Sequence, residues 1–182
     1  MEEEYISQEL GRPIKTVEDK WQIIPAFVRA RGLVRQHIDS FNYFIDEELS
    51  QILEANKRVE SDIDPNFWLE YQDIKVMTPS IREHNKDNIP ITPQECRLRD
   101  LTYAAPIRAI IKFTRQRKIY KKTVTIGYMP IMLQSRHCVL YNNTEDEFVK
   151  NGECPLDPGG YFIFKGVERV ILSQEQMSKN RI

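Results

Sequence analysis

The hydrophobic period of the sequence changes about one third of the way along the chain, and this change limits the folds that it can adopt. Up to about residue 55, apolar residues recur at helical spacing, and from about residue 68 the period changes toward the two of β-strands. Helices lead and strands follow, without the alternation that builds a doubly wound parallel sheet. The pattern therefore predicts an α+β fold: N-terminal helices followed by a mixed, mostly antiparallel sheet with short helices.

The first helix is predicted from its start and stop signals. Thr16 with Asp19 three residues later resembles a weak capping box, and Gly32 is expected to end the segment. Pro25 is expected to kink this helix or split it into two short ones. Residues 1–15 are polar and aperiodic, and they are interpreted as a flexible N-terminal tail.

The second helix carries an apolar stripe that is expected to run to about Ala55, with Asp39 or Ser40 as its cap. A strand is predicted over 68–77 and a polar loop with His84 over 80–90. A short helix is predicted to begin at Thr92-Pro93-Gln94-Glu95, with Thr92 as its cap and Glu95 reaching back. Paired strands are predicted over 107–114 and 119–128, around a turn at 115–118, followed by a short helix capped by Thr144 and Glu147. The last element is a hairpin of 161–164 and 168–172 that turns at Lys165-Gly166.

The overall composition excludes several classes of protein. The 26 Lys and Arg nearly balance the 27 Asp and Glu, so the net charge of -1 provides no general attraction to nucleic acid or membranes. No apolar run reaches the ~20 residues of a membrane helix. Cys96, Cys138 and Cys154 form no Cys-x-x-Cys pair and suit a reducing compartment, the cytosol or nucleus.

No residue pattern predicts catalysis in this chain. There is no Gly-rich phosphate loop, no Gly-x-Ser-x-Gly motif and no Asp-x-Asp-x-Asp motif for magnesium. His137-Cys138 could join Cys96 or Cys154 in a metal site, but adjacent residues on a strand point to opposite faces, and buried or idle thiols explain these residues better. The acidic runs 46–48 and 145–147 are expected on solvated helix surfaces or helix starts. We therefore expect no catalytic, cofactor-binding or metal-binding residues.

One segment departs from the even distribution of charge. Between residues 108 and 122 there are seven basic residues and no acidic one. They are Arg108, Lys112, Arg115, Arg117, Lys118, Lys121 and Lys122. On paired strands such a run can follow a phosphate backbone, and it is equally consistent with a solvated hairpin tip or with a patch that meets an acidic partner. Only Phe113 and Tyr120 lie nearby for stacking, so base-specific recognition is not expected.

Ordered motifs give the chain a resemblance to a known family, the second-largest subunits of multisubunit RNA polymerases. They cover about residues 16–182 and are KWQIIPAF (20–27), GLVRQHIDSFN (32–42), PQECRLRDLTY (93–103), PIML (130–133) with Cys138, CPLDPGGYFI (154–163) and GVERVIL (166–172). The segments TVEDKW (16–21), QHIDSFNYFI (36–45) and QEQMSKNRI (174–182) look most like class III, with the archaeal subunit as the nearest alternative. Tyr128 and His137 stand where the family usually has Arg and Asn, so a phosphate or carboxylate contact by that Arg is not carried over.

The resemblance implies the first segment of the protrusion, over 16–182, on one side of the DNA cleft, with the chain ending before the lobe. In the family, magnesium is held mainly by the largest subunit and zinc lies elsewhere, so none is expected here. The implied partners are other polymerase subunits, above all the largest subunit, template DNA, nascent RNA and general transcription factors, in the nucleus and without a membrane. For class III, the implied products are small RNAs such as tRNA and 5S rRNA.

Two expectations accompany this resemblance. A protein-interaction module without DNA contact is the main alternative function, whereas a self-contained hydrolase or transferase has no motif to support it. If later sequence completes the sheet, the 182 residues should expose an open strand edge or an apolar patch. We then expect self-association or marginal stability.

Overall fold

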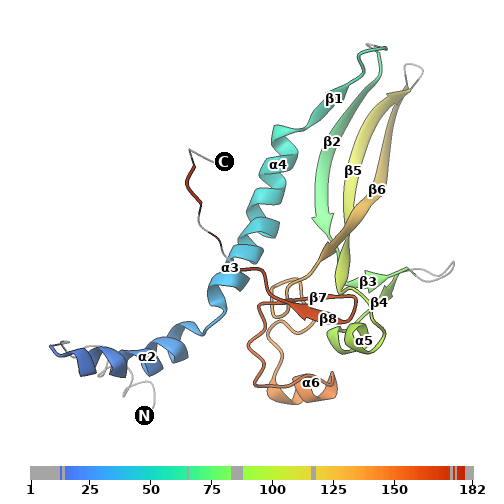
Figure 1. The fold of residues 1–182 in the computed structure, drawn as a ribbon. Helices are drawn as coiled ribbons and strands as arrows, with labels where there is room; N and C mark the ends of the chain where they lie inside the picture. The colour runs from blue at the N-terminus through green and yellow to red at the C-terminus, as the bar shows by residue number, and fades with distance from the viewer. Residues whose placement is uncertain are drawn as a thin grey trace.

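The computed structural model describes residues 13, 15–64, 66–82, 88–115, 118–172, 174 and 176–178. Figure 1 shows a small body of short elements, a long sheet that rises from it, a helical rod beside the sheet, and a separate N-terminal helix that extends away. The helices come first in the chain and the strands follow, so the predicted α+β class is confirmed.

Helix α2 (Val17–Arg31) has the predicted ends. The Asp19 N–H donates to Thr16 Oγ1 at 3.2 Å, and the Thr16 N–H donates to Asp19 Oδ2 at 2.9 Å, which completes the capping box. Gly32 follows the helix with a φ of 68°, a conformation that favours glycine. Of the two outcomes expected at Pro25, a kink or a split, the split did not occur: a proline removes one backbone hydrogen bond, but its fixed φ is helical, and the helix continues through it.

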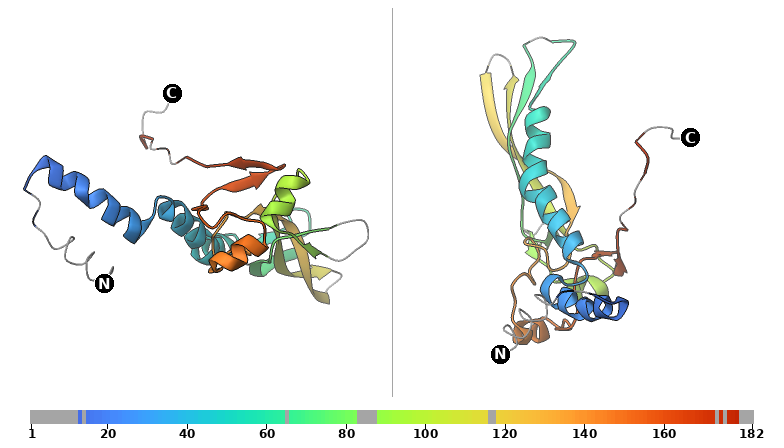
Figure 2. Two further views of the ribbon diagram at one scale, coloured as in Figure 1. Left: turned by 90° about the horizontal axis from the view of Figure 1, so that it is seen from below. Right: turned by 90° about the vertical axis from the view of Figure 1, so that its left-hand side faces the viewer.

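The rod beside the sheet consists of α3 (Arg35–Tyr43), a π-helical turn η1 (Phe44–Glu48) and α4 (Leu49–Ala55). Its predicted end at Ala55 is confirmed. The predicted caps were wrong, because the helix begins before them, after Val34, and Asp39 instead pairs with Arg35 one turn earlier at 3.3 Å. α4 lies against β2, as two views show (Figures 1 and 2).

The main sheet contains β1 (Arg58–Glu60), β2 (Trp68–Val76), β5 (Ala104–Arg115) and β6 (Lys118–Pro130) in the order β1-β2-β5-β6. Every pairing in it is antiparallel. The predicted strand at 68–77 and the hairpin of 107–114 with 119–128 are confirmed, and both hairpin strands are longer than expected. β6 forms the outer edge, since no other described strand pairs with its far side.

The short elements of the body mostly follow their predicted signals. The loop prediction for 80–90 was incomplete, because its ends pair as β3 (Ser80–Ile81) and β4 (Ile89–Pro90); His84 lies outside the described residues. The remaining elements are helix α5 (Pro93–Leu98), helix α6 (Glu145–Lys150), and the hairpin β7 (Phe162–Phe164) with β8 (Val167–Arg169). The Thr92 cap and the Thr144 capping box are present as predicted. The prediction that the Glu95 side chain reaches back to Thr92 was wrong, because its carboxylate forms an ion pair with Arg99 one turn later at 2.7 Å.

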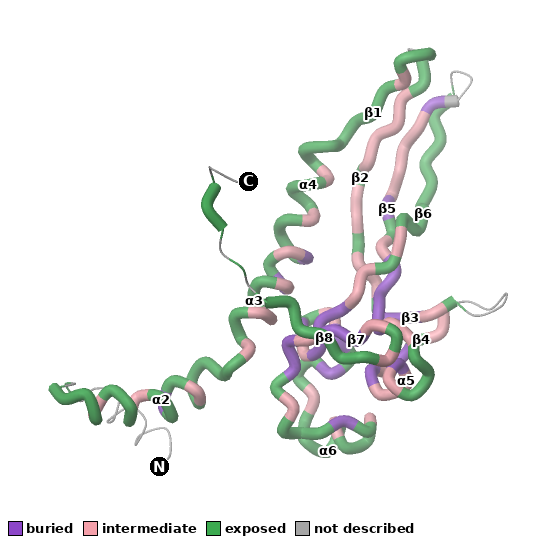
Figure 3. The backbone as a smooth tube through the Cα atoms, in the orientation of Figure 1, coloured by how far each residue is buried: buried purple, intermediate pink, exposed green. Residues whose placement is uncertain are grey.

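The hydrophobic core lies in the body, below the sheet (Figure 3). Tyr103, Ile131 and Ile163 are among its fully buried side chains, and Ile45 reaches it from the helical rod. The upper part of the sheet is half-buried at best along β2 and exposed along most of β6. Across the described ranges, no helix has both the length and the apolar character needed to span a membrane.

Candidate nucleic-acid interface

The seven predicted basic residues lie on the β5–β6 hairpin and its turn. Arg108, Lys112 and Arg115 belong to β5, and Lys118, Lys121 and Lys122 belong to β6. Arg117 lies outside the described residues, and only the backbone of Arg115 is described. Lys112, Lys118, Lys121 and Lys122 thus lie toward the turn of the hairpin, at the end of the sheet far from the body (Figure 1), whereas Arg108 lies further along β5, opposite Thr125.

The strand register divides these side chains between two faces. Lys112 lies opposite Lys121, and Arg108 lies opposite Thr125, so the three basic residues share one face. Lys118 and Lys122 alternate with them and belong to the other face. The basic side chains therefore do not form a single patch. They form two rows, one on each face of the β5–β6 hairpin.

The neighbouring strand moderates the charge of the first row. Two like charges directly opposite each other, as at Lys112 and Lys121, destabilise a strand pair. Across the other side of β5, Glu70 of β2 is the register partner of Lys112. The Lys112 ammonium also lies 5.6 Å from the centre of the Trp68 ring, within the range of a cation–π contact. β6 itself contains no acidic residue, so its three exposed lysines dominate the outer edge.

The nearby aromatic rings do not form a platform for bases. Phe113 and Tyr120 are cross-strand partners whose ring centres lie 5.6 Å apart with an interplanar angle of 22°, so they stack on each other. A base would have to compete with this contact. The arrangement suits sequence-independent phosphate contacts better than base recognition.

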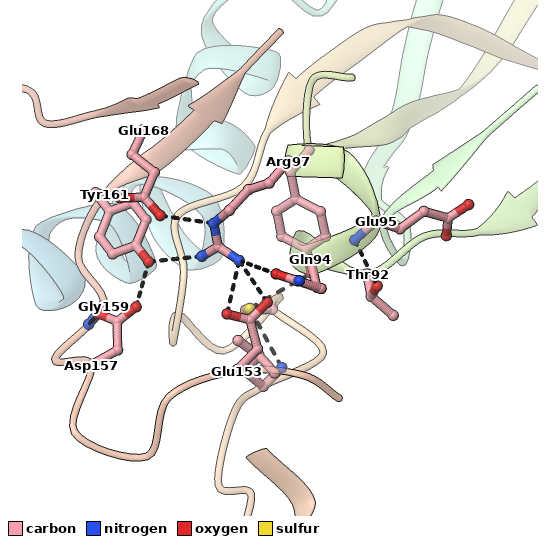
Figure 4. Close-up of polar contacts among 12 residues, drawn as sticks. Thr92, Gln94, Glu95, Arg97, Glu153, Asp157, Gly159, Tyr161 and Glu168 are labelled. Carbon is pink, nitrogen blue, oxygen red and sulfur yellow. Dashed lines mark hydrogen bonds and ion pairs between the residues drawn. The ribbon is translucent and has the colours of Figure 1, made fainter. Parts of the chain in front are cut away.

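A second polar cluster, which we call the Arg97 cluster, was not anticipated from the sequence (Figure 4). The Arg97 guanidinium on α5 donates to both carboxylate oxygens of Glu153 at 2.8 Å and to Glu168 of β8 at 2.7 Å. It also donates to the Tyr161 hydroxyl at 2.9 Å, and that hydroxyl donates to Asp157. The cluster therefore ties helix α5 to the segment after α6 and to the β7–β8 hairpin.

Burial and neighbouring charge shift the pKa of Arg97 in opposite directions. Burial lowers the pKa of Arg97, but the hydrogen bond and negative charge of Glu153 outweigh it, and the pKa is raised overall. Burial and the bond to Asp157 raise the pKa of Tyr161. Arg97 therefore stays charged and the Tyr161 hydroxyl stays protonated at neutral pH, and the hydrogen bonds hold three segments together, so the geometry indicates a structural role. The sequence signal that could have identified this cluster is that Arg97, Asp157, Tyr161 and Glu168 all lie in segments that carry the family resemblance, 93–103, 154–163 and 166–172.

Other candidate residues also form tertiary contacts. Asp46, expected on a solvated helix face, accepts from Arg136 at 2.6 Å and lies 3.4 Å from His137, which fixes η1 to the loop 131–143. His137 and Cys138 lie in that loop and not on a strand; Cys138 is buried and accepts from the Tyr103 hydroxyl. In the part of the chain that the structure describes, no three His, Cys, Asp or Glu residues gather in a way that could hold a metal ion.

Comparison with known proteins assigns the chain to a family. Residues 32–178 match the RNA polymerase beta subunit family, and because this match covers most of the chain, the protein belongs to that family. At the level of individual relatives, it is 53% identical to the DNA-directed RNA polymerase III subunit RPC2 of Saccharomyces cerevisiae over 98% of this chain, and 51% identical to subunit rpc2 of Dictyostelium discoideum over 100%. The archaeal subunit Rpo2 of Saccharolobus solfataricus is 38% identical over 92% of the chain.

The identities confirm the resemblance to the class III subunit over the archaeal alternative. The chain spans 15%, 11% and 15% of the length of these three relatives, respectively. What the complete relatives do therefore concerns much more sequence than these 182 residues.

Proposed function

We propose that this chain works as part of the second-largest subunit of DNA-directed RNA polymerase III, the nuclear nucleotidyltransferase that copies DNA into small RNAs such as tRNA and 5S rRNA. The observation that carries the proposal is a difference in identity. Relatives named for polymerase III share 47% to 53% of their residues with the chain, whereas the archaeal relative shares 38% and a polymerase II subunit of Arabidopsis thaliana shares 34%.

Within that assembly, the chain has an architectural role as part of the protrusion. It forms a wall of the DNA cleft and docks neighbouring subunits, the largest one above all, together with general transcription factors. No residue of this chain is assigned a catalytic role, and the magnesium used in RNA synthesis is held elsewhere in the enzyme. A long sheet that projects from a buried core supports this role, because such a sheet can carry side chains far from the core that positions it.

The basic hairpin guides DNA without reading its sequence. Lys118, Lys121 and Lys122 are exposed on a strand that has no acidic residue, which favours attraction to phosphates. The mutual stacking of Phe113 and Tyr120 leaves base readout without a platform. Nascent RNA and template DNA pass through the cleft as the substrates of the assembly, not of this chain alone.

A segment replacement tests the proposed identity. The matching segment of the Saccharomyces cerevisiae RPC2 gene would be replaced by the sequence of this chain, and the matching segment of archaeal Rpo2 would serve as the control. We expect the first chimera to assemble into polymerase III and to sustain tRNA synthesis, and the archaeal chimera to do so less well. Failure of the first chimera to co-purify with polymerase III subunits would refute the proposal.

Charge reversal tests the DNA contact in the assembled enzyme. The triple substitution Lys118→Glu, Lys121→Glu and Lys122→Glu should weaken DNA binding and lower the salt dependence by roughly 0.9 in the logarithmic slope per lost phosphate contact. A matched triple reversal at Lys20, Lys150 and Lys165, which are exposed outside the sheet, should leave the slope unchanged. Equal slopes for both triple variants would refute DNA guidance by the hairpin.

The second candidate is a protein-interaction surface without DNA contact. It is favoured by the division of the basic side chains between the two faces of the hairpin, because one duplex lying against either face would leave the lysines of the other face without a phosphate contact. A photo-crosslinker at Tyr120 of the assembled enzyme would separate the two functions. Crosslinks to DNA favour guidance, and crosslinks to protein alone favour the interaction surface.

A further inference from the structure

The two faces of the β5–β6 hairpin differ in chemical character over residues 121–125. One face, which we call the Lys121 face, has a cation followed by two hydroxyls along β6. Its members are Lys121, Thr123 and Thr125, which lie opposite Lys112, Ile110 and Arg108 of β5. The other face, which we call the Lys122 face, combines its lysines with apolar and aromatic residues. Its members are Tyr120, Lys122 and Val124, which lie opposite Phe113, Ile111 and Ala109.

Burial distinguishes the two faces where β5 passes Arg108. Ala109 on the Lys122 face is fully buried, and its register partner in β2, Ile74, is half-buried. On the Lys121 face, Arg108 and its register partner Thr125 are both exposed. Antiparallel sheets commonly pack one face on apolar neighbours and leave the other in water. Around Arg108, the Lys121 face is therefore the solvated one.

Acidic residues of β2 neutralise only part of the positive charge on the Lys121 face. The cations with an acidic neighbour are Lys75, which pairs with Asp73 at 3.3 Å, and Lys112, whose register partner is Glu70. Arg108 and Lys121 form no ion pair with another described residue. These two cations lie at opposite ends of the row that contains Thr123 and Thr125, since Arg108 is the register partner of Thr125. The row therefore consists of hydrogen-bond donors with a free cation at each end.

We propose that the Lys121 face binds the phosphate backbone of one strand of duplex DNA. Arg108 and Lys121 pair with phosphates, and the hydroxyls of Thr123 and Thr125 donate to phosphate oxygens between them. Arg, Lys and Thr side chains all donate to phosphates in protein–DNA complexes. Side chains on one face of a strand follow one another at about 7 Å, so this row offers its donors in a straight line. The inference rests on the proposed DNA contact and specifies the face and the side chains that make it.

The composition of the two faces favours this assignment. On the Lys122 face, Val124 is 37% exposed and Tyr120 is 43% exposed, so a phosphate placed there would lose water against apolar surface. The Lys121 face offers hydroxyls at the corresponding positions of β6. In addition, β5 and β6 contain no Asn, Gln, Asp or Glu, the side chains that read adenine and cytosine. The face therefore suits backbone contacts that do not depend on base sequence.

Two double variants with the same change of charge test the face in the assembled enzyme. Arg108→Gln with Lys121→Gln removes two cations from the Lys121 face, and Lys118→Gln with Lys122→Gln removes two from the Lys122 face. Binding of a fluorescent DNA duplex would be measured by anisotropy over a range of salt concentrations. The first pair should lower the logarithmic salt slope by roughly 1.8, which is about 0.9 for each lost phosphate contact, and the second pair should change it little. Because both pairs remove equal charge from one hairpin, a difference between them reports direct contact.

Removing the hydroxyls tests the same contact at constant charge. Thr123→Val with Thr125→Val keeps the β-branched shape that suits a strand but removes both donors. This variant should bind the duplex about tenfold more weakly, with an unchanged salt slope and to the same extent for duplexes of different sequence. Thr123→Ser with Thr125→Ser retains the hydroxyls and should retain the affinity.

The outcomes separate this inference from the proposed function. An equal or larger loss of slope with the Lys118 and Lys122 pair would overturn the assignment of the face, while DNA guidance by the hairpin would stand. If no hairpin variant alters DNA binding, including the triple charge reversal, DNA guidance itself fails. Loss of a polymerase subunit or transcription factor from the Arg108 and Lys121 variant, with unchanged DNA affinity, would assign the Lys121 face to a protein and overturn the inference.

Discussion

Replacing Arg97 with Met tests whether the Arg97 cluster holds the body together. Met retains much of the apolar stem of arginine but removes the guanidinium that bonds Glu153 on both oxygens. The Glu153 side chain is only 4% exposed, so in the variant a buried carboxylate loses its main partner. Glu168 is 52% exposed and can be solvated instead.

The expected loss of stability in Arg97→Met follows from this difference in burial between Glu153 and Glu168. Breaking a buried ion pair by removing one partner costs about 3–5 kcal/mol, whereas an exposed pair contributes about 0–1 kcal/mol. Because Arg97 retains 20% exposure, we expect a loss near the lower end, about 3 kcal/mol. That is a large share of the roughly 5–15 kcal/mol that stabilises a typical domain.

Urea unfolding followed by circular dichroism measures the effect at pH 7. The matched control is Arg35→Met, because Arg35 pairs with Asp39 while both side chains are more than half exposed, at 57% and 64%. The double variant Arg97→Met with Glu153→Gln should recover part of the loss, since it no longer buries a charge. The reasoning is refuted if Arg97→Met costs no more than Arg35→Met, or if the double variant is less stable than Arg97→Met.

Three further predictions concern turns, thiols and caps. Gly166→Ala should lower the stability of the folded chain by more than about 1 kcal/mol, because φ is 75° and an added Cβ would lie 2.6 Å from Asp100 Oδ1. The control is Gly127→Ala, whose Cβ would meet no atom within 4 Å, so its melting temperature should be nearly unchanged. Native alkylation followed by mass spectrometry should modify Cys154 and spare Cys96, which is buried and whose pKa burial raises to about 11. Removal of the capping box by Thr144→Ala should cost about 1 kcal/mol in urea unfolding, and no change would contradict the assigned cap.

The raised pKa of Cys96 also gives a pH dependence. Burial holds the folded thiol protonated up to a pKa of about 11, whereas the unfolded thiol releases its proton near pH 9. The unfolded state therefore binds fewer protons between these values, and stability falls as the pH rises through this window. Cys96→Ala should flatten the fall between pH 9 and 11 in urea unfolding, and an identical slope in the variant would contradict this account.

Local signals in the sequence predicted most of the secondary structure. Caps at Thr16, Thr92 and Thr144 act within one helical turn, so their sequence pattern suffices. The paired strands of the β5–β6 hairpin are equally local. The failures came where local preference competes with context: Asp39 is a good cap residue, but the helix continues past it because the rod packs its apolar side on the core through Phe41, Phe44 and Ile45.

The candidate sites depended more strongly on tertiary structure. The run of basic residues was visible in the sequence, but only the register shows that Lys112 and Lys121 share one face and Lys122 the other. The Arg97 cluster joins residues 56 and 71 positions apart, a separation at which charge patterns carry no information. Likewise, a cavity at Tyr128 is lined by residues of four strands, β3, β5, β6 and β7, which only the tertiary fold brings together.

The most direct test of the central claim is to purify this protein from its own cells through an affinity tag and to map the genes to which it crosslinks. If the chain is part of the second-largest subunit of RNA polymerase III, it should co-purify with the other subunits of that enzyme and crosslink to genes for tRNA and 5S rRNA. Crosslinking mainly to protein-coding genes, or purification without any polymerase subunit, would contradict the account.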